Sequence, residues 1–448
     1  MSKKLTRRDF LRGTSYVAAA SALAACAPQV APTNAPAAAQ PTNAPAVSKE
    51  VVKLSYWHGW AVDTEKKAME DAVKMFNDSH PNIQVEPTSG KTNDMVLTAV
   101  SGGNPPDVWS LWSTQTLAEW ASKGVIMDLN DRVANAKIDT TQFTKGALDV
   151  STYKGKFYGL PIEVDPLVVY YNKGLFKEAG LDPEKPPKTM EELYNAAVKL
   201  TKLDADGNVT QLGWNDWAPF MEAYLYGGEW WNPVTGEPTA NASGNVASWN
   251  MIADYYEKFG AEKLGTFNSQ QADNPLGSLF VAGKVGMALD GDWVVNFMTR
   301  FGPTIDYGLF PLPPAMGHED RAMSTYLDGS VYVIPSGAPH PYEAWEFVSW
   351  MATSKEASGL LQKVWSNTSP IKTVVTDPAY APHDRWQIFI DMMQKGQHFV
   401  WPPIAISAMY STELATALDA VKFGQKEPQA ALDELQAKMA DELKKASQ

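Results

Sequence analysis

The chain has 448 residues, of which 44% are apolar and 20% charged, and its formal net charge is −13. This length is sufficient for two domains with large cores, and the acidic balance argues against nucleic acid as a partner because phosphates attract basic surfaces. No run of 18 or more apolar residues occurs, so the sequence predicts no membrane-spanning helix. Sixteen Trp and seventeen Tyr residues provide rings for cores and for stacking on sugar faces.

The first 26 residues carry two export signals. Residues 6–11, with the sequence TRRDFL, match a twin-arginine (Tat) signal, which routes proteins across a bacterial cytoplasmic membrane. Residues 23–26, LAAC, resemble a lipobox, in which the cysteine is lipidated and becomes the mature N-terminus. Cys26 is the only cysteine; the alternative for a lone cysteine is an inert, buried thiol. The two signals together predict a lipoprotein anchored to the outer face of the cytoplasmic membrane.

Residues 27–49 have the composition of a disordered tether. They consist largely of Ala, Pro, Thr, Asn and Gln, and the sequence PTNAPA occurs twice. Such a segment can bury too little apolar surface to fold. Because Pro-rich chains extend about 3.1 Å per residue, the tether could reach roughly 70 Å from the membrane.

From residue 51 to residue 123, predicted strands and helices alternate. A helical repeat places Ala68, Ala72 and Phe76 on one face of a helix that ends before Pro81. Strands that alternate with helices of this length are typical of βαβ units, and hence of a mainly parallel sheet covered on both faces. The predicted elements are strands at 51–57, 83–86 and 107–109 and helices at 64–79, 93–101 and 114–123.

Cap and turn residues give the local signals farther along the chain. Residues 189–192 (TMEE) form a capping box, which predicts a helix that runs to about Leu203. Residues 206–207 (DG) predict a hairpin turn; the alternative, a calcium loop that starts at Asp204, has its glycine at the fourth rather than the sixth position. After about residue 246 the chain is predicted to be mostly helical, with strands near 305–310 and 330–335.

The motifs of several enzyme classes are absent from the sequence. It contains no Gly-x-Ser-x-Gly elbow and no His-Glu-x-x-His helix. Residues 277–284, the nearest match to a phosphate loop, have their glycines one position too far apart. With six His and no cysteine near them, a zinc site is not expected, and the sequence predicts neither a metal nor a cofactor.

Glu163 and Asp165 are the one carboxylate pair that has to be considered for chemistry. Two positions apart on an extended segment, they would face the same way at about 6.5 Å. That separation is compatible with the acid and base of a glycosidase. It is equally compatible with two acceptors for sugar hydroxyls or with two solvated side chains, and the sequence leaves these alternatives open.

Several segments together resemble family 1 extracellular solute-binding proteins, the substrate-capturing lipoproteins of ABC importers for sugars. The central match covers residues 153–161 (YKGKFYGLP), 169–176 (VYYNKGLF) and 189–193 (TMEEL). Supporting matches lie at 81–85, 106–108, 280–287, 291–293 and 341–347. Each segment alone is weak, whereas their order and spacing are specific to the superfamily and say little about the ligand.

The resemblance implies an α/β, two-lobed periplasmic-binding-protein-like fold, with each lobe a mainly parallel sheet flanked by helices and the ligand cleft between the lobes. Residues 50–162 plus 328–370 would form the first lobe, and residues 163–327 plus 371–448 the second. The implied function is capture of a sugar or oligosaccharide by hinge closure. A monomer would deliver this ligand to the permease subunits of an ABC importer without catalysing a reaction. The alternatives are a binding protein for another small solute and a secreted glycosidase that uses Glu163 and Asp165.

Ten residues are candidate ligand contacts. The ends of strands, which face the ligand in open α/β sheets, give Trp57, His58, Trp60 and Trp112. The crossing segment gives Glu163 and Asp165. The resemblance to sugar-binding members of the family points again to Asp165 and adds Trp217, Trp293, Asp328 and Tyr410. Rings would cover the C–H faces of a sugar and carboxylates would accept its hydroxyl hydrogens; each Trp could instead be a core or rim residue.

Overall fold

The structure, a computed structural model, describes residues 51–446 apart from 113, 216–217, 271–277 and 302–303. The predicted export signal, Cys26 and the predicted tether lie outside the described residues. Within the described part of the chain, none of the helices combines the length and the apolar character that crossing a membrane requires.

A ten-stranded sheet organises residues 51–446, with the strand order β2-β1-β3-β11-β6-β9-β8-β7. Two further strands attach to it, β10 to β6 and β12 to β11. The main strands are β1 (Val52–Trp57), β2 (Ile83–Thr88), β3 (Val108–Trp112), β6 (Leu160–Asn172), β7 (Lys202–Leu203), β8 (Val209–Asn215), β9 (Val285–Gly291), β10 (Tyr307–Phe310), β11 (Thr325–Val333) and β12 (His398–Phe399). A separate short hairpin joins β4 (Thr152–Tyr153) to β5 (Lys156–Phe157).

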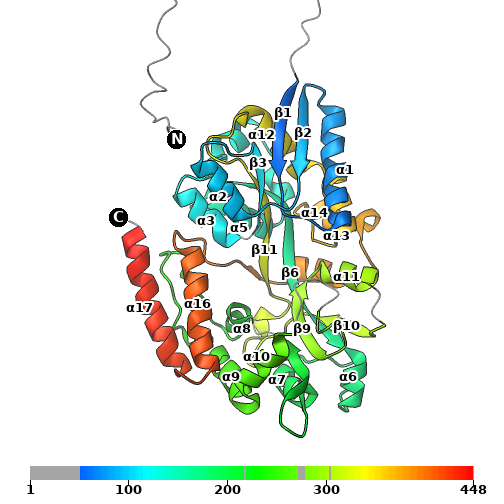
Figure 1. Cartoon of the computed structure of the whole chain (residues 1–448), viewed down its shortest axis with the longest axis vertical. Helices are drawn as coiled ribbons and strands as arrows, with labels where there is room; N and C mark the ends of the chain where they lie inside the picture. The colour runs from blue at the N-terminus through cyan, green and yellow to red at the C-terminus, as the bar shows by residue number, and fades with distance from the viewer. Residues whose placement is uncertain (1–50, 113, 216–217, 271–277, 302–303, 447–448) are drawn as a thin grey trace, which may run out of the picture. The chain divides into compact units, whose positions relative to one another are not determined.

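The two long strands β6 and β11 connect two lobes (Figure 1). The first part of β6 pairs with β11, and β11 continues the sheet of the first lobe by pairing with β3. The second part of β6 pairs with β9 and β10 in the second lobe. β6 runs from the first lobe to the second and β11 returns, so the two strands are antiparallel.

Each lobe therefore contains a mixed sheet. β1 is parallel to β2 and to β3, and β8 is parallel to β9, as βαβ units require. The antiparallel pairs of the main sheet involve the crossing strands, β6 and β11, or the short edge strand β7. The predicted two-lobed α/β fold is confirmed. The prediction that each lobe has a mainly parallel sheet is wrong for the second lobe, where β6–β9, β6–β10 and β7–β8 are antiparallel and β8–β9 is parallel. A strand that crosses from one lobe to the other runs against its neighbours there, and β7 returns to β8 through a tight turn.

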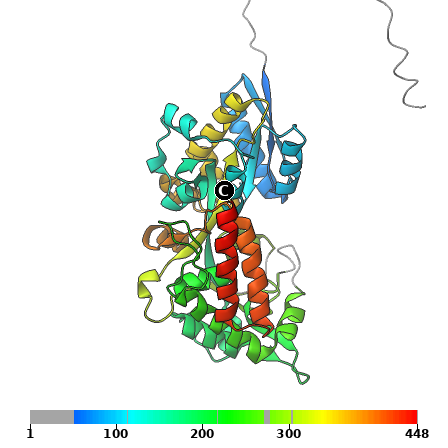
Figure 2. The same cartoon turned by 90° about the vertical axis from the view of Figure 1, so that its left-hand side faces the viewer.

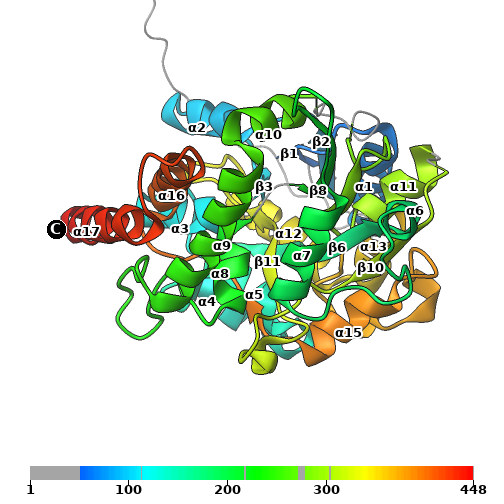
Figure 3. The same ribbon diagram turned by 90° about the horizontal axis from the view of Figure 1, so that it is seen from below.

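Helices cover both faces of the sheet in each lobe. In the second lobe α16 and α17 pack side by side (Figure 2), α7 and α10 pack against β8 (Figure 3), and α9 packs against α8. The first-lobe helices are α1 (Asp63–Ser79), α2 (Asn93–Ser101), α3 (Thr114–Ser122), α4 (Asn130–Asn135), α5 (Lys145–Ser151), α12 (Pro341–Thr353), α13 (Lys355–Trp365) and α14 (Lys372–Val375). Those of the second lobe are α6 (Lys173–Glu178), α7 (Met190–Leu200), α8 (Pro219–Leu225), α9 (Ser243–Phe259), α10 (Ala261–Asn268), α11 (Val294–Phe301), α15 (Gln387–Lys395), α16 (Ser407–Lys422) and α17 (Pro428–Ala446).

Buried hydrophobic side chains form three clusters. Two lie on opposite faces of the first-lobe sheet, one beneath α1, α12 and α13 and the other beneath α3 and α5. The third fills the second lobe around β8, β9 and the helices that cover them. Ile371 and Val374 belong to the cluster beneath α3 and α5. The lobe limits given by the resemblance stay a prediction.

The local predictions agree with the structure where cap and turn residues set them. Thr189 Oγ1 accepts the main-chain N–H of Glu192 at 3.2 Å, as expected of an N-cap. Asp204 accepts the N–H groups of Asp206 and Asn208 within the turn that joins β7 to β8, so the hairpin prediction is confirmed. The helix α7 ends at Leu200, three residues earlier than predicted, because β7 begins at residue 202. The strand predicted near 330 begins at residue 325, and β9 was not predicted.

A close approach of α7 to β8 makes Gly213 irreplaceable by larger residues. A Cβ on Gly213 would lie 1.8 Å from the carbonyl oxygen of Ala197, a main-chain atom that a side-chain rotation cannot move. We expect Gly213→Ala to destabilise the protein by at least about 2 kcal/mol, measured by urea denaturation. Gly265→Ala is the control, because Gly265 lies in α10 with open space around its Cβ position, so roughly 0.5–1 kcal/mol of stabilisation is expected there. Equal effects of the two substitutions would contradict the packing described.

Candidate functional site

Carboxylates gather on one face of the two crossing strands. Residues that lie directly opposite each other on paired strands point to the same face, and Asp165 lies opposite Asp328 while Glu163 lies opposite Ser330. Since side chains alternate along a strand, all four share one face. β11 also pairs with β3, and in that pairing Ser330 lies opposite Trp112. The side chain of Trp112 therefore leaves the sheet on the same face as the carboxylates.

Hydrogen bonds fix the two carboxylates of β6. Glu163 is buried, and its Oε2 accepts the main-chain N–H of Ser330 at 2.9 Å. Asp165 is half-buried, and its Oδ1 accepts from the amide of Asn367. On β11, Asp328 Oδ1 accepts its neighbour Gly329 N–H at 3.0 Å. The strand pair thus presents carboxylates in set orientations toward the space beside it.

A fourth carboxylate comes from the second lobe. Asp292 follows β9 directly and is fully buried. Its Oδ2 accepts the hydroxyl of Thr368 at 2.6 Å, whereas its Oδ1 has no hydrogen-bond partner among the described residues. We refer to Glu163, Asp165, Asp292 and Asp328 as the carboxylate cluster.

Burial and mutual repulsion raise the pKa values in the carboxylate cluster. Burial is the main cause for Glu163, whose pKa lies well above its usual range, and the charge of Asp165 adds to the shift. For Asp165 burial raises the pKa to about 7; the hydrogen bond from Asn367 opposes this shift and Asp328 adds to it. The pKa of Asp292 is raised by burial and then by Asp165. The described residues contain no group of three or more His, Cys, Asp or Glu side chains placed to hold a metal ion.

Trp112 is an exposed tryptophan beside the carboxylate cluster, and it packs against other aromatic rings. Trp112, at the end of β3, is 43% exposed and meets the ring of Trp60 edge-on at 5.6 Å. Trp60 is only 8% exposed, because it stacks on Trp365 at 4.3 Å. The stacked pair holds Trp112 in place and leaves its ring available to a ligand.

Two other residues predicted from the end of the first strand have different surroundings. His58 is 1% exposed between the rings of Tyr56 and Trp60, and burial lowers its pKa to about 4. Trp57 is half-buried, with Lys91 Nζ 4.7 Å from the centre of its ring. The ring of His58 therefore packs against the ring of Trp60, and the ring of Trp57 faces the ammonium group of Lys91.

Of the predicted second-lobe residues, the structure places Trp293 next to the carboxylate cluster. Trp293 follows Asp292, is half-buried and covers Gly291, where a Cβ would lie 1.9 Å from its ring. Tyr410 lies instead in the core of the second lobe, fully buried, with its hydroxyl bonded to the carbonyl of Trp230 at 2.9 Å. Trp217 lies outside the described residues.

A second cleft opens on the opposite face of the crossing strands. Leu327, which precedes Asp328 and so points the other way, packs against Gly146 of α5. The same helix lines a cleft of about 1610 Å³ through Lys145 and Asp149. Its other walls include Tyr153, Tyr158, Tyr224, Trp231 and Phe399, and none of the nine candidate residues that the structure describes lines it.

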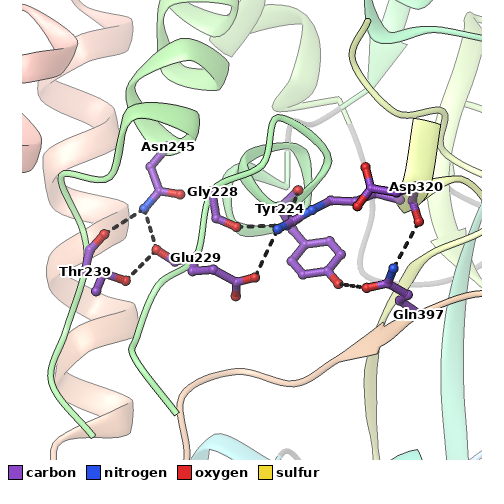
Figure 4. A network of polar contacts seen from close by, with 8 residues as sticks. Tyr224, Gly228, Glu229, Thr239, Asn245, Asp320 and Gln397 are labelled. Carbon is purple, nitrogen blue, oxygen red and sulfur yellow. Dashed lines mark hydrogen bonds and ion pairs between the residues drawn. The ribbon is translucent and has the colours of Figure 1, made fainter. Parts of the chain in front are cut away.

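A polar network braces one wall of the second cleft (Figure 4). Arg321 donates to the main-chain oxygens of Tyr224 and Gly228 at 2.6 and 3.1 Å and forms an ion pair with Glu229 at 3.3 Å. The hydroxyl of Tyr224 donates to Gln397 Oε1 at 3.1 Å. These bonds join the end of α8 to the segments that precede β11 and β12.

Comparison with known proteins identifies the family. Residues 60–358 match the bacterial extracellular solute-binding protein family. The chain belongs to this family.

Three proteins that are similar to this chain share 25% to 30% sequence identity with it. The solved structure of CpMnBP1 with mannotriose bound is 30% identical, has a TM-score of 0.74 and is covered in full by 87% of this chain. The galactooligosaccharide-binding protein of Bacillus subtilis is 25% identical over 84% of this chain and 86% of its own length. The sn-glycerol-3-phosphate-binding periplasmic protein of Brucella abortus is 25% identical over 64% of this chain and 65% of its own length.

In this solute-binding protein, reasoning from the sequence missed the partners of the predicted carboxylates. Asn367 and Thr368 follow α13 in a loop without periodicity, and nothing in their local sequence shows that they reach Asp165 and Asp292. Trp365 belongs to a helical repeat that is typical of a core. A hydrogen bond from Asn296 to the carbonyl of Val364, at 3.1 Å, brings the second-lobe helix α11 to the same segment.

The raised pKa of Asp165 predicts a pH-dependent stability of the solute-binding protein. Its pKa of about 7 in the folded protein exceeds the ordinary value of about 3.9, so the folded state holds this proton more tightly. Stability from this group is therefore present below about pH 4 and lost as the pH rises to about 7. We expect Asp165→Asn, which cannot ionise, to be more stable than the parent by about 1–2 kcal/mol at pH 8 and equal to it at pH 4.

Denaturation of the ligand-free protein at both pH values measures this difference. Asp206→Asn serves as the control, because Asp206 is exposed in the β7–β8 turn and asparagine is also favoured there. A stability difference for Asp165→Asn that does not change between pH 4 and pH 8 would contradict the burial of its charge.

Proposed function

We propose that the chain is the extracytoplasmic sugar-binding component of an ABC importer. It would bind a sugar or oligosaccharide between its lobes and present it to a membrane permease. The observation that carries the proposal is the exposed ring of Trp112 beside carboxylates that come from both crossing strands and from the second lobe. The mannotriose complex of CpMnBP1 and the galactooligosaccharide-binding relative support a carbohydrate ligand.

The chemistry of a sugar fits these groups. Its C–H faces stack on Trp112 and Trp293, and its hydroxyls donate to Asp165, Asp292 and Asp328. These residues come from both lobes, so a ligand makes all of its contacts only when the lobes close. The ligand thereby stabilises the closed form, and a permease can distinguish loaded from empty protein.

The proposal makes the protein a monomeric binding protein and not an enzyme. The alternative of a glycosidase that uses Glu163 and Asp165 predicts new reducing ends when the protein is incubated with oligosaccharides. The alternative of a non-sugar solute predicts no binding across a panel of neutral oligosaccharides.

Trp112 provides the sharpest test of where the ligand binds. We expect Trp112→Ala to weaken the binding of mannotriose or another panel oligosaccharide about 10- to 100-fold, because a desolvated aromatic contact is lost. Trp293→Ala should have an effect of similar size. Calorimetric titration gives the affinity, and the melting temperature without ligand shows whether the fold is intact.

Trp231→Ala is the matched control, because Trp231 lines the second cleft. We expect the Trp231→Ala protein to bind the oligosaccharide with the affinity of the parent. Loss of binding in Trp231→Ala with normal binding in Trp112→Ala would move the ligand to the second cleft and contradict the proposed site. Hydrolysis of the oligosaccharides that disappears in Glu163→Gln would contradict the binding-only function.

The predicted lipid anchor is tested separately. Cys26→Ala removes the residue that would be lipidated, so we expect the protein to move from the membrane fraction to the soluble fraction after cell breakage. Replacing both Arg7 and Arg8 by lysine should instead block export. Retention of the Cys26→Ala protein in the membrane fraction would show that the lipobox interpretation is wrong.

A further inference from the structure

The loop after α13 is attached to the crossing strand. Ser366 ends α13 in the left-handed conformation, with φ of 66°, which turns the chain toward β6. Thr368 then pairs with Val164 of β6, whose N–H donates to the Thr368 carbonyl at 2.9 Å. The loop therefore runs alongside the strand that carries Glu163 and Asp165.

Buried polar contacts hold this loop in a single arrangement. The N–H of Ser369 donates to Gln362 Oε1 at 3.0 Å, and its hydroxyl lies 2.6 Å from that of Ser358. Ser366, Thr368 and Ser369 are all buried. Because buried polar groups without partners are costly, these bonds make other positions of the loop unfavourable.

Two consecutive side chains of the loop orient one carboxylate of the crossing strand β6 and one carboxylate that follows β9 in the second lobe. Asn367 donates to Oδ1 of Asp165, and Thr368 donates to Oδ2 of Asp292. Each carboxylate is thereby held through one oxygen. The remaining oxygen of Asp292 is buried and has no partner among the described residues, so its hydrogen-bond partner has to come from outside them.

A ligand that supplies this hydrogen bond should carry no negative charge. Among the described residues, neither Glu163, Asp165 nor Asp292 forms an ion pair with Lys, Arg or His. At pH 8, above the pKa of about 7 of Asp165, a carboxylate or phosphate brought beside this group would meet a like charge in a space with little water, where repulsion is strong. A sugar hydroxyl brings a hydrogen and no charge.

We propose that the loop of residues 366–369 sets the ligand class of this site. Asn367 and Thr368 act as positioning residues that present Asp165 and Asp292 as fixed hydrogen-bond acceptors. The site thereby accepts uncharged sugars and rejects their anionic counterparts, uronates and sugar phosphates. This inference rests on the proposed sugar-binding function and narrows it. Membership of the family does not by itself decide between uncharged and anionic ligands, since the relative from Brucella abortus is named for binding sn-glycerol-3-phosphate.

A paired ligand panel tests the discrimination at pH 8. Mannotriose, maltotriose and galactotriose are titrated into the purified full-length protein, each beside the trisaccharide that carries C6 carboxylates, together with sn-glycerol-3-phosphate. We expect one or more neutral sugars to bind at least about 100-fold more tightly than the acidic counterpart. An acidic ligand that binds as tightly as its neutral partner would overturn the inference and leave the sugar-binding proposal standing. Failure of every sugar to bind would overturn both.

Variants test the role of the loop. Thr368→Val should weaken binding of the neutral sugar about tenfold, and Thr368→Ser, which keeps the hydroxyl, should restore it. Asp165→Asn keeps an acceptor for Asn367 but removes a charge at pH 8, so we expect it to narrow the neutral-to-acidic affinity ratio by about tenfold. Thr376→Val is the control, because Thr376 is exposed in the same segment and should change neither quantity.

A purely structural loop predicts a different pattern. Thr368→Val would then lower the melting temperature without ligand and leave both the affinity and the neutral-to-acidic ratio of the folded protein unchanged. That result, or an unchanged neutral-to-acidic affinity ratio in Asp165→Asn, would overturn the inference.

Discussion

Cross-strand pairs between β6 and β11 join the two lobes and set the register of everything beside them. In this register Asp165 faces Asp328 and Glu163 faces Ser330. A slip of one residue would turn these side chains to the α5 face and bring Leu327 to the face that now carries the carboxylates. The same pair of strands thus provides both the mechanical connection between the lobes and the direction in which the carboxylates point.

This arrangement has an energetic cost in the empty protein. Like charges opposite each other on neighbouring strands repel, and burial of carboxylates disfavours their ionised form. Here Asp165 and Asp328 are paired in this way, and Asp292 is fully buried with one oxygen unpartnered among the described residues. Departures from local stability rules of this kind are expected where a site is built for a ligand. A ligand that donates hydrogen bonds would offset part of the cost.

The two faces of the crossing strands differ in character. On one face, carboxylates and the Trp60–Trp365 stack bring groups from both lobes together around Trp112. On the other, a wide cleft lies beside α5, and a network around Arg321 braces its wall. The first face combines hydrogen-bond acceptors with a supported ring, the groups that the proposed sugar ligand requires, whereas the second face borders a cleft of about 1610 Å³.

The sequence by itself determined what depends on neighbours along the chain. The alternation of strands and helices, the cap at Thr189 and the turn after Asp204 could all be predicted, because a few adjacent residues control them. The two-residue spacing of Glu163 and Asp165 also sufficed to place them on one face of a strand. The resemblance in ordered motifs indicated the two-lobed fold, which spacing and periodicity alone do not give.

Only the tertiary structure decided which of the predicted residues surround one site. It buried Tyr410 in the core and placed Trp60 beneath Trp112, although all three are aromatic residues that a sugar could contact. It also brought Thr368 to Asp292, which lies 76 positions earlier in the chain. Such contacts arise when separate segments pack against the same pair of strands, so they depend on the register and curvature of the sheet. No short window of sequence contains that information, because each partner's own neighbours are compatible with many other positions in space.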